Sequence, residues 1–591
     1  NGFNYGDMTS VAVSPDGKKI AVAIQAENYA EKGVAALFSC AENGSPTLIS
    51  TVDVGVQPDM ITFADNSTIL TADEGEPRDG VNGEDPKGSV SIVKIGQDNK
   101  LTANTVYFDS FDQKRDELTA KGVLIQKNTD PSTDFEPEYI AVNGNTAYIS
   151  LQEANAIAVL NIASGEFTGV YPLGFQDYGE TKVDLQKNDT IEFKNYSNVY
   201  GIKMPDGISV TEIGGKTYLL TANEGDSRAD WTGLDNEYEN VTSPTGNVTL
   251  EKKVVWFNAT LWDGLNGNKA YVFGGRSFSV YEATDNGLVL VYDSGSEFEE
   301  ITAQKLPDYF NTSNDKNSID NRSGKKGPEP ESVVTGVIGN KTFAFIALER
   351  IGGIMVYDIT DPANTKFANY INSREFDEVI KGDVSPEGLC FIPASSSKTG
   401  KALLLAACEV SGTLAAYQCD YEQPETNDYK ITEGANGTWT QNSDGTLTII
   451  ANGDFAKFTG IKVDGKLIDA SNYTAVSGST KVTLKAEYLK TLSAGTHEVT
   501  FVYTDGECST NLEVKKVSSK ETKPTEENKT DTTTSTDSEK DNSNNGTSDD
   551  TKSPQTGDKC NLALWLALLF ISGAGTLVTV VYKKRKNRSR V

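Results

Sequence analysis

The sequence predicts an all-β protein: a seven-bladed β-propeller, a small β-sandwich, a disordered stalk and one C-terminal hydrophobic helix. Three observations lead to this prediction. A unit of three or four short strands recurs along residues 1–424, apolar and polar residues alternate through 425–516, and an apolar run fills 561–582.

The recurring unit begins with proline and an acidic residue, continues with a strand, a turn and a second strand that ends in glutamate, and closes with a third strand. Five copies are "PDMITFADNSTILTADEG", "PEYIAVNGNTAYISLQEA", "PDGISVTEIGGKTYLLTANEG", "PESVVTGVIGNKTFAFIALERIG" and "PEGLCFIPASSSKTGKALLLAACEVSG", which begin at Pro58, Pro137, Pro205, Pro330 and Pro386. All-β repeats of this size are typical of a propeller, whose blades pack radially around a channel.

Two further segments bring the count to seven. "MTSVAVSPDGKKIAVAIQAEN", near the start, has Gln25 in place of the glutamate, and residues 269–295 form a divergent copy. Seven blades would close a ring. The chain begins at Asn1 in a segment that already reads as a strand, so either a secretion signal has been removed or the start is missing. In the second case, an eighth blade or part of one is missing as well.

Two sets of carboxylates are expected at one mouth of the channel, because the first strand of a blade starts at that face and the second strand returns to it. The acids at the strand starts are Asp59, Glu138, Asp206, Glu331 and Glu387, and those at the strand ends are Glu74, Glu153, Glu224, Glu349 and Glu409. Clustered carboxylates raise each other's pKa unless something compensates their charge. Ca²⁺, which prefers oxygen ligands, is the cofactor that would suit such a ring.

Two interpretations of this ring stay open. It binds a cation, or each glutamate caps its own turn and pairs with a neighbouring arginine. Recurrence in nearly every blade favours the architectural role. The arginines expected on the ligand face are Arg78, Arg228, Arg276 and Arg350.

Three long loops should give this face its asymmetry. They are "GEPRDGVNGEDPKG" after Glu74, "GDSRADWTGLDNEYENVTSP" after Glu224, and "NTSNDKNSIDNRSGKKGPEP" at 311–330. Binding residues usually lie on loops that a rigid scaffold positions. Residues 76–85 are therefore where a ligand is expected first.

Residues 425–516 alternate apolar and polar residues between Gly/Asp turns, which is the pattern of a small antiparallel sandwich. "FTGIKVDGKLIDASNYTAVSGSTKVTLKAEYLKTLSAGTHEVTFVYTDGE" resembles an Ig-like module of extracellular proteins that is often described as carbohydrate-binding. Trp439 and Tyr473 would be its sugar-stacking residues, but core packing is the commoner use of such aromatics. A spacer role is the preferred interpretation.

The C-terminal region divides into a stalk and an anchor. Residues 517–552 are too polar to bury a core and are predicted to be disordered. Residues 553–591 carry Ser553, Pro554, Gln555, Thr556 and Gly557, then the apolar span 561–582, long enough to cross a bilayer, and a basic tail at 583–591. This order resembles a Gram-positive, LPXTG-like sortase signal. The resemblance implies cleavage between Thr556 and Gly557, attachment to peptidoglycan and a single-pass membrane intermediate; the alternative is a plain membrane anchor.

A second resemblance covers about residues 1–420. "VGVQPDMITFADNSTILTADEGEPRDG", "FGGRSFSVYEA", "KGPEPESV" and "ALERIGGIMVYDITDP" are similar to the choice-of-anchor I domain, a YVTN-like propeller family. The family implies an extracellular location more firmly than an activity, since some members are named mesenchyme-specific cell surface glycoprotein and others alkaline phosphatase-like.

Composition excludes several function classes. The formal charge is −30, with 84 acidic and 54 basic residues, which argues against nucleic acid binding. The single histidine, His497, lies outside the predicted propeller, and no C-x-x-C pair occurs, so a His-dependent hydrolase and a structural zinc site are disfavoured. We therefore expect a cell-wall-anchored protein that binds an extracellular glycan, protein or matrix ligand, with a Ca²⁺-dependent phosphoesterase as the alternative.

Overall fold

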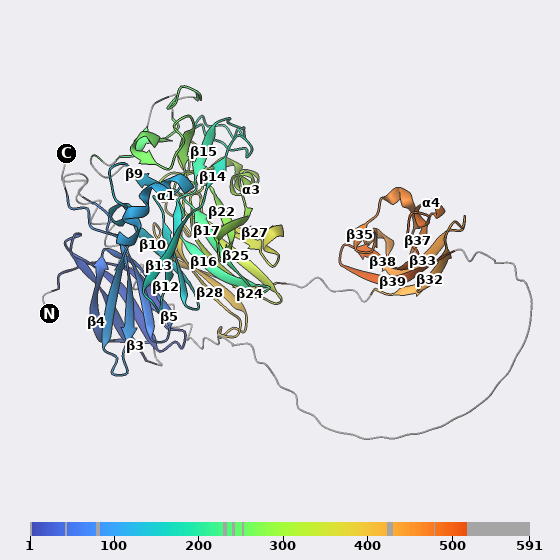
Figure 1. Ribbon diagram of the computed structural model, residues 1–591, viewed down its shortest axis with the longest axis horizontal. Helices are drawn as coiled ribbons and strands as arrows, with labels where there is room; N and C mark the ends of the chain where they lie inside the picture. The colour runs from blue at the N-terminus through green and yellow to red at the C-terminus, as the bar shows by residue number, and fades with distance from the viewer. Residues whose placement is uncertain are drawn as a thin grey trace, which may run out of the picture. The chain divides into compact units, whose positions relative to one another are not determined.

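The computed structural model describes residues 3–516 except 42–43, 79–82, 229–232, 234, 239–240, 242, 251–252, 422–428 and 478. Strands dominate it (Figure 1). The described residues form two compact units; the first ends at Asp420 and the second begins at Tyr421.

Six antiparallel sheets build the first unit as the blades of a propeller. The first three blades are β1 (Tyr5–Val13), β2 (Lys19–Ala26), β3 (Lys32–Cys40) and β4 (Pro46–Val56); β5 (Pro58–Asp65), β6 (Thr68–Asp73), β7 (Ser89–Ile95) and β8 (Leu101–Tyr107); and β10 (Pro137–Asn143), β11 (Thr146–Leu151), β12 (Ala156–Asn161) and β13 (Glu166–Pro172).

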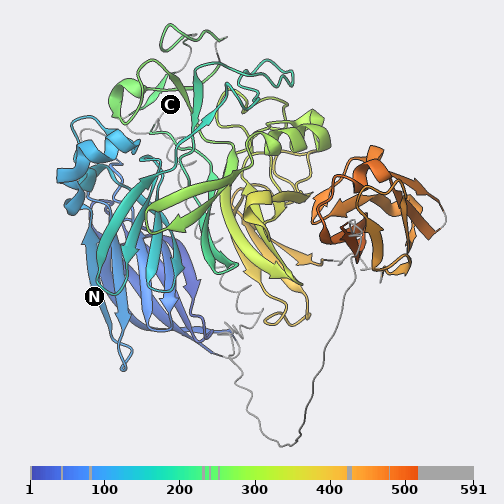
Figure 2. The same cartoon turned by 45° about the vertical axis from the view of Figure 1, so that its right-hand side comes forward.

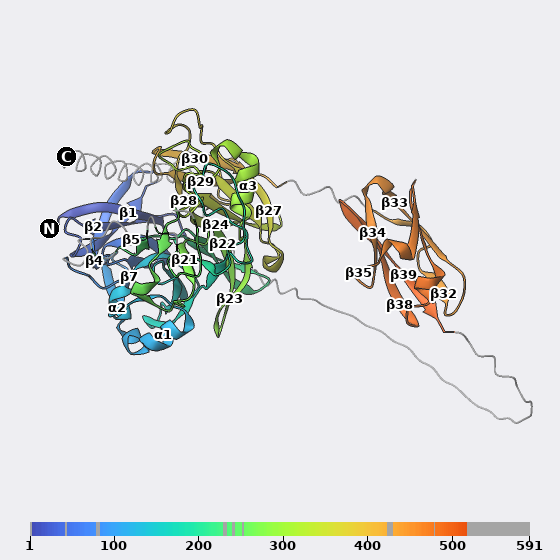
Figure 3. The same cartoon turned by 90° about the horizontal axis from the view of Figure 1, so that it is seen from above.

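The other three blades are β16 (Ile208–Ile213), β17 (Lys216–Asn223), β22 (Ser277–Thr284) and β23 (Gly287–Asp293); β24 (Pro330–Ile338), β25 (Lys341–Leu348), β26 (Ile354–Asp358) and β27 (Lys366–Ile371); and β28 (Pro386–Ile392), β29 (Ala402–Cys408) and β30 (Thr413–Cys419). The first strands of consecutive blades contact each other in the order β1, β5, β10, β16, β24, β28. Seen from above, the blades follow one another around the unit (Figure 3). The predicted β-propeller is confirmed.

The expectation that residues 269–295 form a blade of their own is wrong. β22 pairs with β17, with Ser277 opposite Asn223, and β23 pairs with β22, so this segment supplies the two outer strands of the blade that begins at Pro205. The predicted seven units therefore become six blades among the described residues. The long insertion between Asn223 and Ser277 hides this pairing in the sequence.

Smaller elements fill the insertions. They are β14 (Phe175–Asp177), β15 (Val199–Ile202) and β21 (Ala270–Phe273) in one sheet; the pairs β18 (Glu237–Tyr238) with β19 (Trp256–Phe257) and β9 (Ile125–Gln126) with β20 (Trp262–Asp263); and α1 (Arg115–Lys121), α2 (Pro131–Asp134) and α3 (Glu297–Lys305). Figures 1 and 2 show β14, β15, α1 and α3 gathered at one end of the blades, the upper end in both views.

The hydrophobic core lies between neighbouring blades. Leu70 and Val90 of one blade pack in the same cluster as Ile140 and Ile149 of the next. The second strand of the blade is the most deeply covered, since β6 is buried throughout while β5 keeps partly exposed residues.

The second unit is a β-sandwich. One sheet holds β31 (Ile431–Glu433), β33 (Leu447–Asp454), β37 (Ser479–Leu484) and β36 (Tyr473–Val476); the other holds β32 (Gly437–Thr440), β39 (Gly506–Lys515), β38 (Gly495–Tyr503), β34 (Phe458–Val463) and β35 (Lys466–Leu467). A short helix, α4 (Ala486–Leu489), precedes β38. Ile449 and Leu484 from the first sheet share a core with Phe501 and Leu512 from the second, which confirms the predicted sandwich.

Candidate functional site

The carboxylates at the strand starts converge at one mouth of the channel. Glu138, Glu331 and Glu387 are the second residues of β10, β24 and β28. The carboxyl group of Asp206 interacts electrostatically with Asp59 and is hydrogen-bonded to Glu331, so acids of three different blades face one another. The structure therefore brings together the first predicted set.

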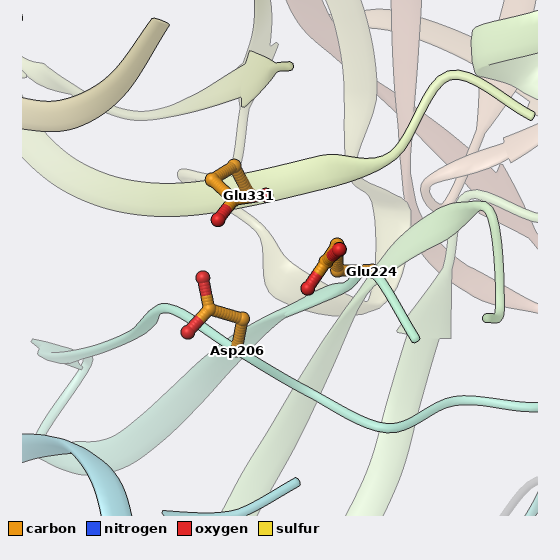
Figure 4. A group of neighbouring side chains, drawn as sticks. All are labelled: Asp206, Glu224 and Glu331. Carbon is orange, nitrogen blue, oxygen red and sulfur yellow. The ribbon is translucent and has the colours of Figure 1, made fainter. Parts of the chain in front are cut away.

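The glutamates at the strand ends join the same group. Glu74 interacts with Asp59 and Glu138, and Glu153 interacts with Glu138. Three triads have carboxylate oxygens within 4.8 Å of one another: Asp206, Glu224 and Glu331; Glu224, Glu329 and Glu349; and Glu349, Glu387 and Glu409. Figure 4 shows the first triad, in which three side chains from separate segments point toward one another. All ten predicted acids thus belong to one cluster, called the carboxylate ring below.

The carboxylates of the ring are buried close together, and this raises their pKa values. Burial, followed by the neighbouring carboxylates, raises the pKa of Glu138, Glu331 and Glu387 well above the ordinary glutamate value. Glu387 is also hydrogen-bonded to Glu409, as Asp206 is to Glu331. Like charges at this spacing are stable only when protons or cations neutralise part of them. The ring can therefore take up either.

Protein cations approach several of the strand-end glutamates. Lys326 Nζ lies 2.7 Å from Glu224, and Arg350 Nε lies 3.0 Å from Glu349. Arg78 lies at the edge, 3.3 Å from Glu76 and 4.0 Å from Glu74. The architectural interpretation thus holds for some strand-end glutamates, whereas the strand-start acids face mainly other acids.

Arg228 and Arg276 lie in buried ion-pair networks rather than on the ligand face. Arg228 is 4% exposed and donates to Glu136 at 2.9 Å. Arg276 is 1% exposed, donates to Glu299 at 2.9 Å, and donates to the carbonyl oxygens of Asp184, Ser323 and Lys325. Both side chains hold inserted segments against the blades.

Several residues of the mouth were missed in the sequence. Glu136 and Glu329 precede the prolines that open β10 and β24, so the tripeptide Glu-Pro-Glu occurs in two blades, and this recurrence is the signal that could have found them. Asp226, Arg322 and Lys326 lie in loops that show no comparable pattern. Their positions depend on how the insertions fold.

A pocket of about 350 Å³, called the mouth pocket, opens among the predicted loops. It draws residues from the loop after Glu74, the loop after Glu224 and the segment 311–330, together with Arg350. Its lining residues are Glu76, Asp226, Ser227, Glu237, Val255, Phe273, Arg322, Lys325, Lys326 and Arg350. Parts of the loops expected to hold ligand, including 79–82 and 229–232, lie outside the described residues.

The two aromatic candidates of the sandwich are not open stacking platforms. Trp439 is 4% exposed in the core, and its Nε1 donates to the carbonyl oxygen of Gly445. Tyr473 is half-buried and packs edge-on against Phe458. Both side chains serve the packing of the sandwich.

The stalk and the sorting signal, residues 517–591, lie outside the described residues, and so does the apolar span 561–582. Within the part of the chain that the structure describes, no helix has the length and apolar character needed to cross a bilayer.

Comparison with known proteins identifies two families along the chain. Residues 432–514 match the carbohydrate binding domain X2. Gigasin-3a of Magallana gigas is 31% identical over 173 residues, which cover 27% of this chain and 60% of that protein. The mesenchyme-specific cell surface glycoprotein of Strongylocentrotus purpuratus is 27% identical over 280 residues, which cover 40% of this chain and 36% of that protein. The chain thus spans less than two thirds of the length of either relative.

Among solved structures, the Cps50 (Swd1) β-propeller domain of Myceliophteria thermophila aligns with a TM-score of 0.34 and 8% identity, covering 70% of this chain and 83% of that one. The second of the two family matches is to the choice-of-anchor I domain, and it confirms the resemblance seen in the sequence. This match covers residues 1–362 of 591, which lie in the propeller and make up more than half of the length. The chain therefore belongs to the choice-of-anchor I domain family.

Proposed function

We propose that this chain is an extracellular surface protein that binds a glycan, protein or matrix ligand at the loop-bearing mouth of its propeller. Family membership and the relative named as a cell surface glycoprotein support the location. The mouth pocket carries the proposal, because it combines loops of separate blades and offers both acidic and basic groups on a rigid scaffold. The match of residues 432–514 to the carbohydrate binding domain X2 lies in the second unit and supports a glycan as a ligand of the chain as a whole.

A glycan array probed with the full chain tests this function. Neutralising two pocket acids, Asp226→Asn with Glu237→Gln, should remove the propeller's share of binding. The matched control neutralises two exposed acids in distant turns, Asp98→Asn with Asp285→Asn. Absence of any array binding, or equal binding by the two double variants, counts against the mouth pocket.

The anchoring step of the proposal is covalent attachment by a sortase. The enzyme would cleave between Thr556 and Gly557 and join the threonine to peptidoglycan. Mass spectrometry of protein released from the wall by muramidase should find a C-terminal peptide that ends at Thr556 and carries wall fragments. Thr556→Ala should keep the protein in the membrane fraction; release of that variant with wall fragments attached would rule out this site.

A Ca²⁺-dependent phosphoesterase is the second candidate, favoured by the three carboxylate triads. Glu224 and Glu349 each belong to two triads and would hold the ion, which would polarise a phosphoryl oxygen. Hydrolysis of p-nitrophenyl phosphate should then require Ca²⁺ and be lost in Glu224→Gln with Glu349→Gln. A chain without Ca²⁺-dependent hydrolysis is not an enzyme of this class.

A further inference from the structure

A second cavity of about 390 Å³ adjoins the mouth pocket, and whereas acids and cations are mixed in the mouth pocket, this cavity is strongly basic. The two share Arg322, Lys325 and Arg350. This basic pocket is lined by Lys187, Ser313, Asn314, Asp315, Lys316, Asn321, Arg322, Lys325 and Arg350. Five of these side chains are cationic and only Asp315 is acidic, in a chain whose formal charge is −30. Such a local reversal of charge favours an anionic ligand.

A buried carboxylate holds the two arginines of the basic pocket in place. Glu329 has no exposed side-chain surface and accepts hydrogen bonds from Arg322 Nε at 2.7 Å and Arg350 Nε at 2.9 Å. Burial opposes its ionisation, but Lys326, Arg322 and Arg350 together hold the pKa of Glu329 well below its ordinary value. The backbone of Glu329 adopts the left-handed conformation, with φ of 52°, as do Gln57, Met204 and Ser385, which also precede the opening proline of a blade.

The hydrogen bonds to Glu329 leave part of the guanidinium groups of Arg322 and Arg350 free to bind a ligand. Arg350 bonds through Nε alone, and Arg322 bonds through Nε and Nη2, so the Nη1 atoms of both and Nη2 of Arg350 donate to no described residue. The side chains of Arg322 and Arg350 keep 15% and 22% of their surface exposed. Arginines fixed at one edge are preorganised to bind an oxyanion at the other.

Two lysines complete the basic pocket from other parts of the chain. Asp320 accepts the backbone N–H groups of Asn188 at 2.5 Å and Asp189 at 2.7 Å, which ties the loop of Lys187 to the segment that carries Lys316. Neither Lys187 nor Lys316 forms an ion pair with a carboxylate of the described residues. Lys316 interacts electrostatically with Asp315 of the same pocket, but neither ammonium group lies within ion-pair distance of a carboxylate of the described residues, so both can reach a ligand.

We propose that the basic pocket binds a tetrahedral oxyanion, a phosphate or sulfate ester, carried on a sugar-sized molecule. Cations from separate segments suit the several oxygens of a tetrahedral group, and the cavity has the volume of a small-ligand site rather than that of an inorganic ion. This inference deepens the proposed function, on which it rests, because it names the chemistry of a ligand at the same face.

Calorimetric titration of the full chain with glucose 6-phosphate, glucose 6-sulfate and glucose tests the inference. Saturable binding is expected for one or both esters and not for glucose, and added NaCl should weaken it. The ester that binds more tightly identifies the source of the oxyanion. Lys187→Gln with Lys316→Gln should weaken ester binding by about tenfold or more. Lys100→Gln with Lys366→Gln, two exposed lysines elsewhere on the propeller, should leave the affinity unchanged.

Glu329→Gln tests the positioning role of the buried carboxylate. Because this variant weakens the interactions that hold Arg322 and Arg350 in place, ester affinity should fall although no lysine has been removed. Circular dichroism reports whether the propeller stays folded. Binding of neither ester, or equal affinity in the lysine double variant and its control, overturns the inference. If the chain binds glycans on the array but neither ester, this inference is wrong and the proposed function still stands. Failure of the inference can therefore be distinguished from failure of the proposed function.

Discussion

Asp73 and Asn223 occupy the same position in two blades and are surrounded by the same hydroxyl groups. Asp73 accepts hydrogen bonds from Thr71, Ser89 and Ser91 at 2.7, 3.0 and 2.7 Å. Asn223 accepts from Thr221 at 2.8 Å and donates to Ser277 and Ser279 at 3.0 and 2.8 Å. The similarity of "LTAD" and "LTAN" therefore reflects a buried polar cluster that ties the second strand of the blade to the third.

Asp73→Asn is expected to stabilise the protein at neutral pH. Burial raises the pKa of Asp73 to about 6 from 3.8. As pH rises between these values, the unfolded chain releases the proton of Asp73 before the folded chain does. The free energy of unfolding therefore falls by about 3 kcal/mol and does not recover above pH 6. Asparagine removes this cost and supplies the N–H donors that Asn223 uses.

Urea unfolding at pH 7.5 and pH 4 measures the effect. A gain on the order of 1–3 kcal/mol is expected at pH 7.5 and almost none at pH 4. Asp98→Asn, which neutralises an exposed acid, serves as the control. An equal gain at both pH values would show that ionisation of Asp73 is not the cause.

The placement of the ring could be predicted because it depends only on local order. An acid that follows the proline and a glutamate that ends the next strand must meet at one face, whatever the loop lengths. By contrast, the pairing of Asn223 with Ser277 and the bond from Arg228 to Glu136 join residues far apart in sequence. Neither contact leaves a periodic signal, because each depends on how an insertion folds back.

Gly225→Ala should destabilise the propeller more than Gly214→Ala. Both glycines have positive φ, 87° and 60°. A Cβ on Gly225 would lie 2.2 Å from the backbone nitrogen of Gly274, whereas a Cβ on Gly214 would meet nothing within 4 Å. The Gly214 variant should cost about 1 kcal/mol for backbone strain alone. The Gly225 variant should cost at least about 2 kcal/mol more, because the clash forces the backbone apart. Equal midpoints in urea would contradict the predicted contact.

Removal of the Arg228 guanidinium should destabilise the protein, because the buried acids Asp134 and Glu136 would lose their positively charged partner. Arg228 lies 3.4 Å from Asp134 and 2.9 Å from Glu136, and both acids are 3% exposed. Arg228→Met should reduce the free energy of unfolding by about 3–5 kcal/mol. Adding Glu136→Gln should recover part of the loss, because it removes a charge left without its partner. A double variant no more stable than Arg228→Met would instead assign the loss to packing against Trp262, whose ring centroid lies 5.1 Å from the guanidinium carbon.

Calcium should stabilise the protein more at pH 8 than at pH 5.5, because protons and cations compete for the carboxylate ring. Burial raises the pKa of Glu349 to about 8 and that of Glu153 to about 7, so these groups hold protons in mildly acidic solution and release them as pH rises. A Ca²⁺ concentration about 100-fold above Kd would add about 2.7 kcal/mol of stability. This corresponds to a rise in melting temperature of about 3 °C, because a unit as long as the propeller shifts by only about 1 °C per kcal/mol.

Thermal melts at the two pH values, with Ca²⁺ and with EDTA, measure this linkage. Asp206→Asn with Glu331→Gln replaces two carboxyl groups of the triad of Figure 4 with amides and should abolish most of the Ca²⁺ shift. In EDTA at pH 8 the same variant should melt higher than the unaltered chain, because repulsion within the ring is relieved. The control, Asp98→Asn with Asp285→Asn, replaces the same number of carboxyl groups in exposed turns and should keep the full shift. If Ca²⁺ leaves the melting temperature of the unaltered chain unchanged at pH 8, the ring is held together by protons and protein cations alone.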